Sequence, residues 1–395
     1  MAEPLPVETA RQMVLDAVHP LPAEDVPLAE ARGRILAEGV TSDIEVPPFA
    51  SSAMDGFAVP PGASGELPIA GESRAGHPFD GPVEPGTAVR ISTGAVVPEG
   101  TGAVIQVELT EEADGVVRVP EREPGTNVRG PGEDIRAGAP VLAAGTLLGP
   151  AALGVLASIG RGTARCAAAP RVALLTTGDE LIPPGTPLPP GGIYSSNGPA
   201  LAALVQAAGG RVVQAEDVPD TAEGTRAALG RALEAADVVC VSGGVSVGPH
   251  DHVKGAFADL GVAERFWRVA LKPGKPTWFG TADAVLAFGV PGNPVSALVT
   301  FLLFARPALL ALQGADPAIT RITGRLTAPV SPEPGRMQAL RCLLHAGEDG
   351  WELTPTGPQG SHQLTSMLGA GALALIDAGE HELAAGARVR AELLP

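Results

Sequence analysis

Short apolar runs alternate with segments of helical spacing from residue 171 onward. The apolar runs cover residues 171–177, 211–218, 237–244 and 284–290, a further strand-like segment covers 266–271, and helical segments follow at 198–208, 222–236, after 251 and from 294. Strands that alternate with helices in this way predict a mostly parallel sheet with helices on both faces. Ligands of such sheets bind at the carboxyl ends of the strands, so we expect the loops after Leu175, Val241 and Val290 to lie together.

The rest of the chain shows other patterns. Helical spacing predicts helices at 7–19 and 28–38, and an apolar run predicts another at 150–159. Residues 45–127 are dense in proline and glycine, with short strand-like pieces, and residues 316–395 also contain short strands and turns. Both of these regions are typical of small β domains.

Together these patterns predict an α/β multidomain chain with four parts. A discontinuous N-terminal helical and linker domain would cover 1–44 and 138–168, with a β-rich domain inserted into it at 45–137. A three-layer α/β/α domain with a mostly parallel sheet would cover 169–315, and a small C-terminal β-barrel would cover 316–395.

Composition and charge exclude several classes of partner. The chain has 395 residues, with 27 basic and 44 acidic side chains and a formal charge of −17, which argues against nucleic acid or an anionic membrane as partner. Cys166, Cys240 and Cys342 have neither disulfide nor metal-ligand spacing, and the N-terminus has no apolar core of signal-peptide length. The most apolar stretch, 295–305, is well short of the roughly 20 residues that cross a bilayer and predicts a buried helix. We therefore expect a cytoplasmic protein.

A glycine-rich turn follows the strand that ends near Val241. Its glycines permit positive φ and allow backbone N–H groups to approach a phosphate closely. The following residues offer one carboxylate as a hard ligand for a magnesium ion and two lysines, in the segment KPGKP, as positive charge for an anion. The residues concerned are Gly243, Gly244, Gly248, Asp251, Lys272 and Lys275. The combination indicates a bound nucleotide or another oxyanion, and a tight connection without a ligand is the structural alternative for the glycines.

Polar residues also follow the neighbouring strands. The first strand ends in TTGDEL, which offers hydroxyls, a glycine and two carboxylates for a ribose, a phosphate or a metal ion. A PGNP turn follows the strand at 284–290, and Asp220 follows the strand at 211–218, at the same expected edge. Helix capping is the alternative for the TTGDEL residues and for Asp220, and a structural turn is the alternative for PGNP. Asn197, in the segment IYSSNG, could cap the helix that follows or donate a hydrogen bond to a ligand, and we favour the cap.

Isolated acids occur in the predicted inserted domain. Asp55 lies between small residues, and the segments STGA at 92–95 and GEDI at 132–135 follow far downstream. By themselves, widely separated acids of this kind are typical of a solvated surface.

Nine segments, in order along essentially the whole chain, resemble the molybdopterin molybdenumtransferases, enzymes of the last step of molybdenum cofactor synthesis that are related to the C-terminal domain of gephyrin. The segments are SSAMDGFAV, STGAVVPEG, NVRGPGEDI, TTGDEL, IYSSN, VSGGVSVGPHD, LKPGKP, VPGNPVSA and GSHQLTSM. The resemblance implies a homodimer of elongated four-subdomain chains, in which the α/β subdomain of one chain faces the inserted subdomain of the other. It also implies that adenylylated molybdopterin and molybdate are the substrates, and that AMP and the molybdenum-loaded cofactor are released.

The resemblance further implies roles for particular residues. The lysines and the glycine-rich loop would bind molybdate, Mg²⁺ would be bound by Glu180, Asp220 or Asp251, and Asp55 or Asp134 would position or deprotonate a nucleophile. The implied catalytic residues are Asp55, Asp134, Asp251, Lys272 and Lys275. The implied cofactor-binding residues are Thr93, Glu133, Thr177, Gly178, Asp179, Ser242, Gly243, Gly244, Val245, Ser246, Gly248, Pro291 and Asn293.

Two alternatives belong to other functional classes. A molybdopterin adenylyltransferase would have a similar α/β unit, but such proteins lack the inserted domain and the C-terminal barrel. A non-catalytic molybdopterin-binding scaffold is the second alternative, and the complete set of acids and lysines argues against it. A transient contact with the adenylating enzyme is expected as well, and no nucleic-acid or membrane partner.

Overall fold

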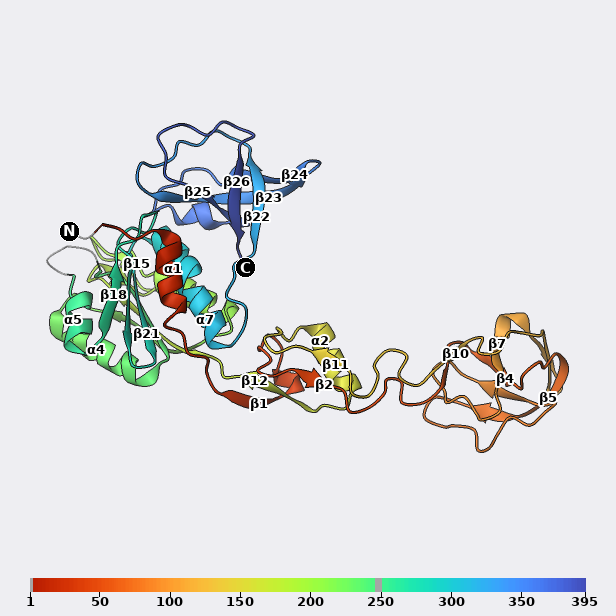
Figure 1. The fold of residues 1–395 in the computed structure, drawn as a ribbon. Coiled ribbons are helices and arrows are strands. Elements are labelled where there is room, and N and C mark those ends of the chain that lie inside the picture. The colour runs from red at the N-terminus through yellow and green to blue at the C-terminus, as the bar shows by residue number, and fades with distance from the viewer. Residues whose placement is uncertain (1–2, 246–250) are drawn as a thin grey trace. The chain divides into compact units, whose positions relative to one another are not determined.

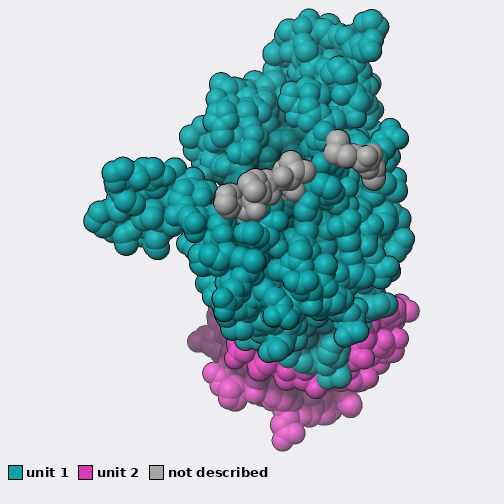
Figure 2. All heavy atoms as spheres, turned by 90° about the vertical axis from the view of Figure 1, so that its left-hand side faces the viewer, with its two compact units in different colours: residues 1–24, 33–37, 165–395 teal, residues 25–32, 38–164 magenta. Residues whose placement is uncertain are grey.

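The computed structural model describes residues 3–245 and 251–395. The chain forms two compact units. Unit 1 contains residues 1–24, 33–37 and 165–395, and unit 2 contains residues 25–32 and 38–164. Figure 2 shows them in teal and magenta. The predicted division into four domains is finer than these two units and stays a prediction.

A six-stranded sheet forms the centre of unit 1. Its strands are β13 (Arg171–Thr177), β16 (Arg211–Val218), β17 (Val238–Ser242), β18 (Ala263–Trp267), β20 (Trp278–Ala282) and β21 (Val285–Val290), in the spatial order β16-β13-β17-β21-β20-β18. The first four strands in this order are parallel, and β20 and β18 are antiparallel to their neighbours. The predicted mostly parallel sheet is therefore confirmed, with β20 as a strand that the sequence pattern did not indicate.

Helices cover both faces of this sheet (Figure 1). They are α1 (Val7–Leu15), α3 (Asn197–Ala207), α4 (Ala222–Ala235), α5 (Val253–Asp259), α6 (Pro294–Thr300) and α7 (Arg306–Leu312). Successive residues of a strand point to opposite faces. Along β13, Val172 and Leu174 therefore pack with α1, α3, α6 and α7, whereas Ala173 and Leu175 pack with α4 and α5. This arrangement confirms the three-layer α/β/α architecture.

The most apolar segment of the chain is a core helix. A π-helical turn, η3 (Phe301–Ala305), joins α6 to α7 without a break. The whole segment, Pro294–Leu312, is long and apolar enough to cross a membrane, with a mean hydropathy of 2.0, but 83% of its apolar window is buried inside the protein. The predicted buried helix is thus confirmed and extends further than the sequence pattern indicated.

A five-stranded barrel forms the C-terminal part of unit 1. Its strands are β22 (Arg321–Leu326), β23 (Met337–Gly347), β24 (Gly350–Pro355), β25 (Ala372–Ile376) and β26 (Arg388–Leu393), with the short helix η4 (Leu364–Met367) between β24 and β25. Pairing of β23 with β25 closes the barrel, and β19 (Leu271–Lys272) adds to β23 from outside. The predicted C-terminal barrel is confirmed, and β19 links it to the α/β region.

Unit 2 is rich in β-structure. Its largest sheet contains β4 (Gly56–Val59), β5 (Gly65–Ser73), β6 (Ala88–Ile91), β7 (Ala103–Gln106), β8 (Glu111–Ala113) and β9 (Val116–Val119), in the order β7-β4-β6-β5-β9-β8. Short antiparallel pairs join β2 (Val40–Thr41) to β11 (Pro140–Leu142) and β3 (Ser51–Ser52) to β10 (Val128–Arg129). The helix α2 (Pro150–Ser158) matches the predicted helix at 150–159.

Two predicted helices differ from the structure. The segment predicted at 28–38 contains only a 3₁₀ turn, η1 (Leu28–Glu30), because Gly33 has a φ of +77° and Leu36 then forms a β-bridge with Cys166. The N-terminal helix, predicted at 7–19, ends at Leu15. The remaining short strands are β1 (Ala23–Pro27) with β12 (Thr163–Ala167), and β14 (Leu181–Ile182) with β15 (Ile193–Tyr194); η2 (Val107–Leu109) follows β7.

Candidate functional site

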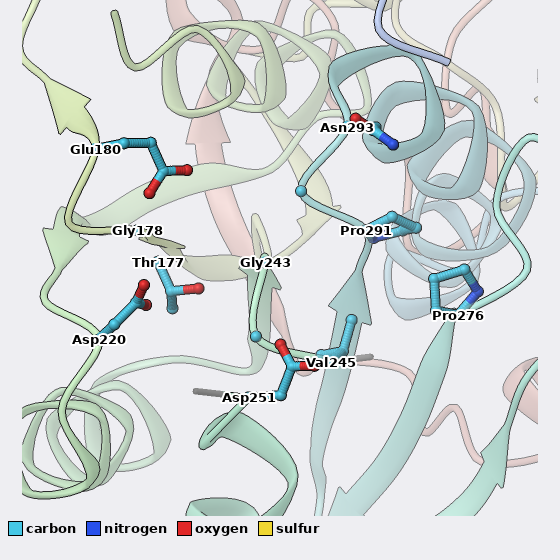
Figure 3. A pocket seen from close by; sticks show the side chains of 12 residues that line it. Thr177, Gly178, Glu180, Asp220, Gly243, Val245, Asp251, Pro276, Pro291 and Asn293 are labelled. Carbon is cyan, nitrogen blue, oxygen red and sulfur yellow. The ribbon is translucent and has the colours of Figure 1, made fainter. Parts of the chain in front are cut away.

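Loops at the carboxyl ends of the parallel strands line a cavity of about 340 Å³ in unit 1 (Figure 3). We call it the acid-lined pocket. Its lining residues are Thr177, Gly178 and Glu180 after β13, Asp220 after β16, Gly243, Gly244 and Val245 after β17, Asp251 before α5, Pro276 before β20, and Pro291, Gly292 and Asn293 after β21. The expectation that the loops after β13, β17 and β21 lie together is confirmed.

Two glycines allow the loop after β17 to pass close to the loop after β13. Gly243 has a φ of +98° and Gly244 a φ of +64°. A β-carbon at Gly243 would lie 2.6 Å from Thr177 Oγ1, and one at Gly244 would lie 2.6 Å from a methyl group of Val253. Both positions therefore require glycine. The N–H of Gly243 already donates to the carbonyl of Val290 (3.0 Å), so a phosphate in this pocket would be bound by other groups of the loop.

Three carboxylates reach the pocket from three different loops. Figure 3 shows Glu180, Asp220 and Asp251 around Thr177 and Gly243. No three His, Cys, Asp or Glu side chains in the described part of the chain form a group that could hold a metal ion by themselves. Magnesium is usually bound by one or two carboxylates together with water and substrate phosphates, and this donor set suits that kind of binding.

Asp179 lies beside these acids in sequence but is not among the residues that line the pocket. Its Oδ1 accepts a hydrogen bond from the backbone N–H of Asp220 at 3.0 Å. Asp179 therefore connects the loop after β13 to the loop after β16 and fixes the position of Asp220.

The KPGKP segment places only Pro276 in the pocket lining. Lys272 Nζ donates to Glu333 Oε2 at 2.5 Å, and Arg336 pairs with the other oxygen of the same carboxylate. The hydrogen bond from Lys272, with that from Arg336, holds the pKa of Glu333 below its ordinary value. Lys275 is exposed. Lys272 is thus engaged with the barrel, and any anion it binds has to compete with Glu333.

A second and larger cavity, of about 630 Å³, adjoins the first. It shares Thr177, Glu180, Gly292 and Asn293 with the acid-lined pocket. Its other lining residues are Thr176, Leu181, Ile193, Tyr194, Ser195, Ser196, Asn197, Ser242, Pro294, His362 and Leu364. We call it the hydroxyl-lined pocket. Ser242, predicted as a cofactor-binding residue, lies here rather than in the first cavity.

Most of these residues are not among the site residues predicted from the sequence. Tyr194 and His362 occur in the segments IYSSN and GSHQLTSM, which carried the family resemblance, so the signal was present. In IYSSN, however, the sequence pattern favours a helix cap at Asn197. The predicted cap is wrong: Ser196 is the N-cap of α3 and Asn197 is the first residue of the helix. The amide of Asn197 donates to Ser242 Oγ and to the carbonyl of Gly292, both at 2.8 Å.

The remaining predicted residues lie in unit 2 or outside the described chain. Asp55 Oδ1 accepts hydrogen bonds from the backbone N–H (2.6 Å) and the hydroxyl (3.0 Å) of Thr93, and these bonds lower the pKa of Asp55. Glu133 accepts a hydrogen bond from the N–H of Gly130, and the backbone of Asp134 donates to Val46. Asp55 and Thr93 are therefore brought together. Ser246 and Gly248 lie outside the described residues.

Known proteins resemble this chain along its whole length. Residues 5–160 match the family described as MoeA N-terminal region (domain I and II), residues 173–311 the probable molybdopterin binding domain, and residues 323–394 the MoeA C-terminal region (domain IV). A molybdopterin molybdenumtransferase of Haemophilus influenzae is 37% identical over 98% of both chains. The chain belongs to the molybdopterin molybdenumtransferase family.

Further comparisons agree with this membership. Molybdopterin molybdenumtransferase 2 of Mycobacterium tuberculosis is 38% identical over 92% of this chain and 93% of its own. A molybdopterin biosynthesis moeA protein from Pyrococcus horikosii has a similar structure, with a TM-score of 0.84, 31% identity and 99% of both chains covered. The family and fold class predicted from the sequence are confirmed, and neither the adenylyltransferase nor the scaffold alternative is favoured.

Proposed function

We propose that this protein transfers molybdenum from molybdate to adenylylated molybdopterin, with release of AMP. The observation that supports this most strongly is the acid-lined pocket, whose lining combines a glycine-rich loop, three carboxylates and the PGNP turn at one sheet edge. Membership of the molybdenumtransferase family indicates the chemistry that such a pocket serves. The proposal includes a cytoplasmic location.

In this proposal the acid-lined pocket binds the phosphoanhydride of the adenylylated pterin. A magnesium ion held by Asp251, with Glu180 or Asp220, would neutralise phosphate charge there. Without a cation the carboxylates would repel the phosphates. The protein itself provides the carboxylate oxygens that would hold the magnesium ion and, next to them, a glycine backbone that can approach the phosphates closely. The backbone around Gly243 and Gly244 then orients the phosphates relative to these acids.

Molybdate is a dianion and needs positive charge. Lys272 and Lys275 are the proposed source. Because Lys272 is paired with Glu333 at 2.5 Å, binding of molybdate would exchange one anionic partner of this lysine for another. No cysteine nucleophile is needed, since the substrate brings its own sulfur ligands. Asp55 and Asp134 are the proposed groups that position or deprotonate an oxygen nucleophile.

The proposed enzyme is a homodimer that receives its pterin substrate through transient contact with the adenylating enzyme. In this arrangement the unit 2 residues Asp55, Thr93, Glu133 and Asp134 of one chain serve the acid-lined pocket of the other. Mixing two inactive variants, Asp55→Ala and Asp251→Ala, after dissociation and reassociation tests the arrangement. Half of the dimers would be mixed and would carry one intact site, so activity should return to about a quarter of the native value. No recovery would show that each chain provides its own complete site.

The central test is AMP release from adenylylated molybdopterin by the purified protein with magnesium, with and without molybdate. Release that depends on molybdate and disappears in Asp251→Asn supports the proposal. Asp259→Asn, an acid at the other end of α5, is the matched control and should retain activity. If the substrate binds but AMP is not released under either condition, the transfer function is wrong.

A further inference from the structure

One tryptophan contacts two walls of the acid-lined pocket without being among its lining residues. Trp267 is the last residue of β18, the strand at one edge of the six-stranded sheet, and it is half-buried. Its side chain contacts the two segments that carry Val245 and Asp251, which both line the pocket (Figure 3). The indole therefore connects two walls of the pocket from outside the lining.

The first contact is a hydrogen bond from the indole to the glycine-rich loop. Trp267 Nε1 donates to the carbonyl of Val245 at 3.1 Å. The side chain of Val245 is buried and packs over β21, where a β-carbon at Gly289 would lie 2.5 Å from one of its methyl groups. Val245 is therefore held at its side chain and at its carbonyl. Because glycine has more conformational freedom than other residues, this anchor also limits the motion of Gly243 and Gly244, directly before it.

The second contact is a cation–π interaction with the first turn of α5. Lys254 Nζ lies 3.3 Å from the centroid of the Trp267 ring. The face of an indole attracts an ammonium group more strongly than any other aromatic side chain does. Burial lowers the pKa of Lys254, and the negative charge of Asp251 opposes this shift, so the lysine and this acid are close enough to interact. The ring of Trp267 thus holds the turn of α5 that directly follows Asp251.

The backbone next to Trp267 is fixed to the KPGKP segment and to the residue that follows it. The N–H groups of Arg268 and Val269 donate to the carbonyls of Thr277 (2.9 Å) and Lys275 (3.0 Å). Arg268 has a φ of +77°, which is uncommon for a residue with a side chain, and its guanidinium carbon lies 4.1 Å from the centroid of the Trp267 ring. Strained backbone of this kind persists where the surrounding structure over-determines it, and it is frequent at functional sites. The indole is thus held firmly at its own strand while it contacts the two walls of the pocket.

We propose that Trp267 is a positioning residue for AMP release, whose indole holds the glycine-rich loop and the start of α5 in their places relative to each other. It acts through Val245, whose loop approaches the phosphates, and through the turn of α5 after Asp251, which binds the magnesium ion. The inference rests on the proposed function, because that function assigns the phosphates and the magnesium ion to this pocket. A role of Trp267 in packing alone would change stability and leave ligand binding as it is.

Steady-state AMP release, measured against adenylylated molybdopterin and against magnesium, tests the two contacts separately. Trp267→Phe removes the N–H group and keeps an aromatic ring for Lys254, Trp267→Leu removes both, and Trp351→Phe, at an exposed tryptophan of the barrel, is the control. Loss of the hydrogen bond should raise KM for the pterin by about 2- to 10-fold in Trp267→Phe, with the half-saturating magnesium concentration within about 2-fold of native. In Trp267→Leu the half-saturating magnesium concentration should also rise, by about 2- to 5-fold, because the cation–π contact is lost. Trp351→Phe should be native in both.

Urea unfolding separates positioning from packing. Stacking of Phe257 on Trp278, with ring centroids 4.7 Å apart, also holds α5 to the sheet, so Trp267→Phe should be fully folded under the assay conditions. A raised KM in this folded variant supports the proposal. A native KM in Trp267→Phe, whatever its stability and kcat, would overturn it, and so would a native magnesium requirement in a folded Trp267→Leu. If the native protein does not release AMP, the proposed function is wrong and this inference with it; native kinetics of both variants beside an active native protein would contradict the inference alone.

Discussion

Arg11 of α1 connects the core helix and the barrel of unit 1, and its removal gives the most direct test of what stabilises this unit. The side chain is buried, and its two terminal nitrogens donate to the two oxygens of Glu392 at 2.9 and 3.0 Å. Its Nε donates to the carbonyl of Leu303 at 3.1 Å. In a regular α-helix that carbonyl would accept from residue 307, but Pro307 has no N–H, so Arg11 replaces the missing donor.

Replacement of Arg11 by alanine should be strongly destabilising. Glu392, whose side chain is only 2% exposed, would keep a single cationic partner, Arg321, at 3.2 Å. Breaking a buried pair by removing one partner typically costs about 3–5 kcal/mol, and the remaining arginine favours the lower end, about 3 kcal/mol. Arg390→Ala is the control, because its ion pair with Asp377 is exposed on both sides and should contribute at most about 1 kcal/mol.

Urea unfolding followed by tryptophan fluorescence measures this loss selectively. All three tryptophans, Trp267, Trp278 and Trp351, lie in unit 1, so the signal reports this unit even if unit 2 unfolds separately. The double variant Arg11→Ala with Glu392→Gln should recover part of the loss, because no uncompensated charge stays buried. A loss below about 1 kcal/mol in Arg11→Ala, or a double variant that is no more stable than the single one, would refute the reasoning.

Two further predictions concern the loops of the site. Gly243→Ala should raise KM for the adenylylated pterin strongly, because a β-carbon at a φ of +98° would lie 2.6 Å from Thr177 Oγ1. The control is Gly255→Ala on α5, where a β-carbon meets open space, and this variant should keep native kinetics. Glu333→Gln should lower KM for molybdate, because Lys272 loses its anionic partner. The pKa of Glu333 is lowered, so its contribution to the free energy of unfolding is present above its ordinary pKa of 4.5 and is lost as the pH falls below that value. The free energy of unfolding of Glu333→Gln, followed by tryptophan fluorescence, should therefore decline less at acid pH than that of the native protein.

The central sheet was predictable because most of its strands are short apolar runs that lie between turns. The predicted strands at 171–177 and 211–218 agree residue for residue with β13 and β16, because each run contains apolar residues and is flanked by turns on both sides. β20 (Trp278–Ala282) was missed because its five residues include a glycine and begin only one residue after the proline-rich KPGKP turn. The false helix at 28–38 had suitable spacing, but Gly33 adopts a conformation that ends a helix. Local pattern therefore succeeded where tertiary contacts agreed with it.

For the candidate site, the sequence predicted which loops lie together but not which of their side chains face the cavity. The rule that loops gather at the carboxyl ends of parallel strands places Thr177, Gly243 and Asn293 together without any knowledge of side-chain contacts. That rule does not say which of two adjacent acids faces the cavity, and Asp179 in fact bonds to the backbone of Asp220. Nor does it reach His362, which arrives from the barrel through packing of distant elements. Contributions of this second kind require the three-dimensional structure.

The acid-lined pocket has a further consequence, because it is proposed to bind a phosphate next to three carboxylates. Like charges oppose such binding unless a cation accompanies the phosphate, so the affinities for AMP and for magnesium should be coupled. Linkage requires the coupling to be reciprocal: magnesium should strengthen AMP binding by the same factor by which AMP strengthens magnesium binding. Calorimetric titration of each in the presence and absence of the other measures both factors.

Asp251→Asn should separate two explanations of this coupling. If Asp251 acts by binding the cation, the variant should bind AMP less tightly in the presence of magnesium and more tightly in its absence, because one repelling charge is gone. Asp259→Asn, which changes an acid at the opposite end of α5, should alter neither affinity. Equal AMP affinity with and without magnesium in the native protein would show that backbone groups alone bind the phosphate, and that the three carboxylates of this pocket serve another step.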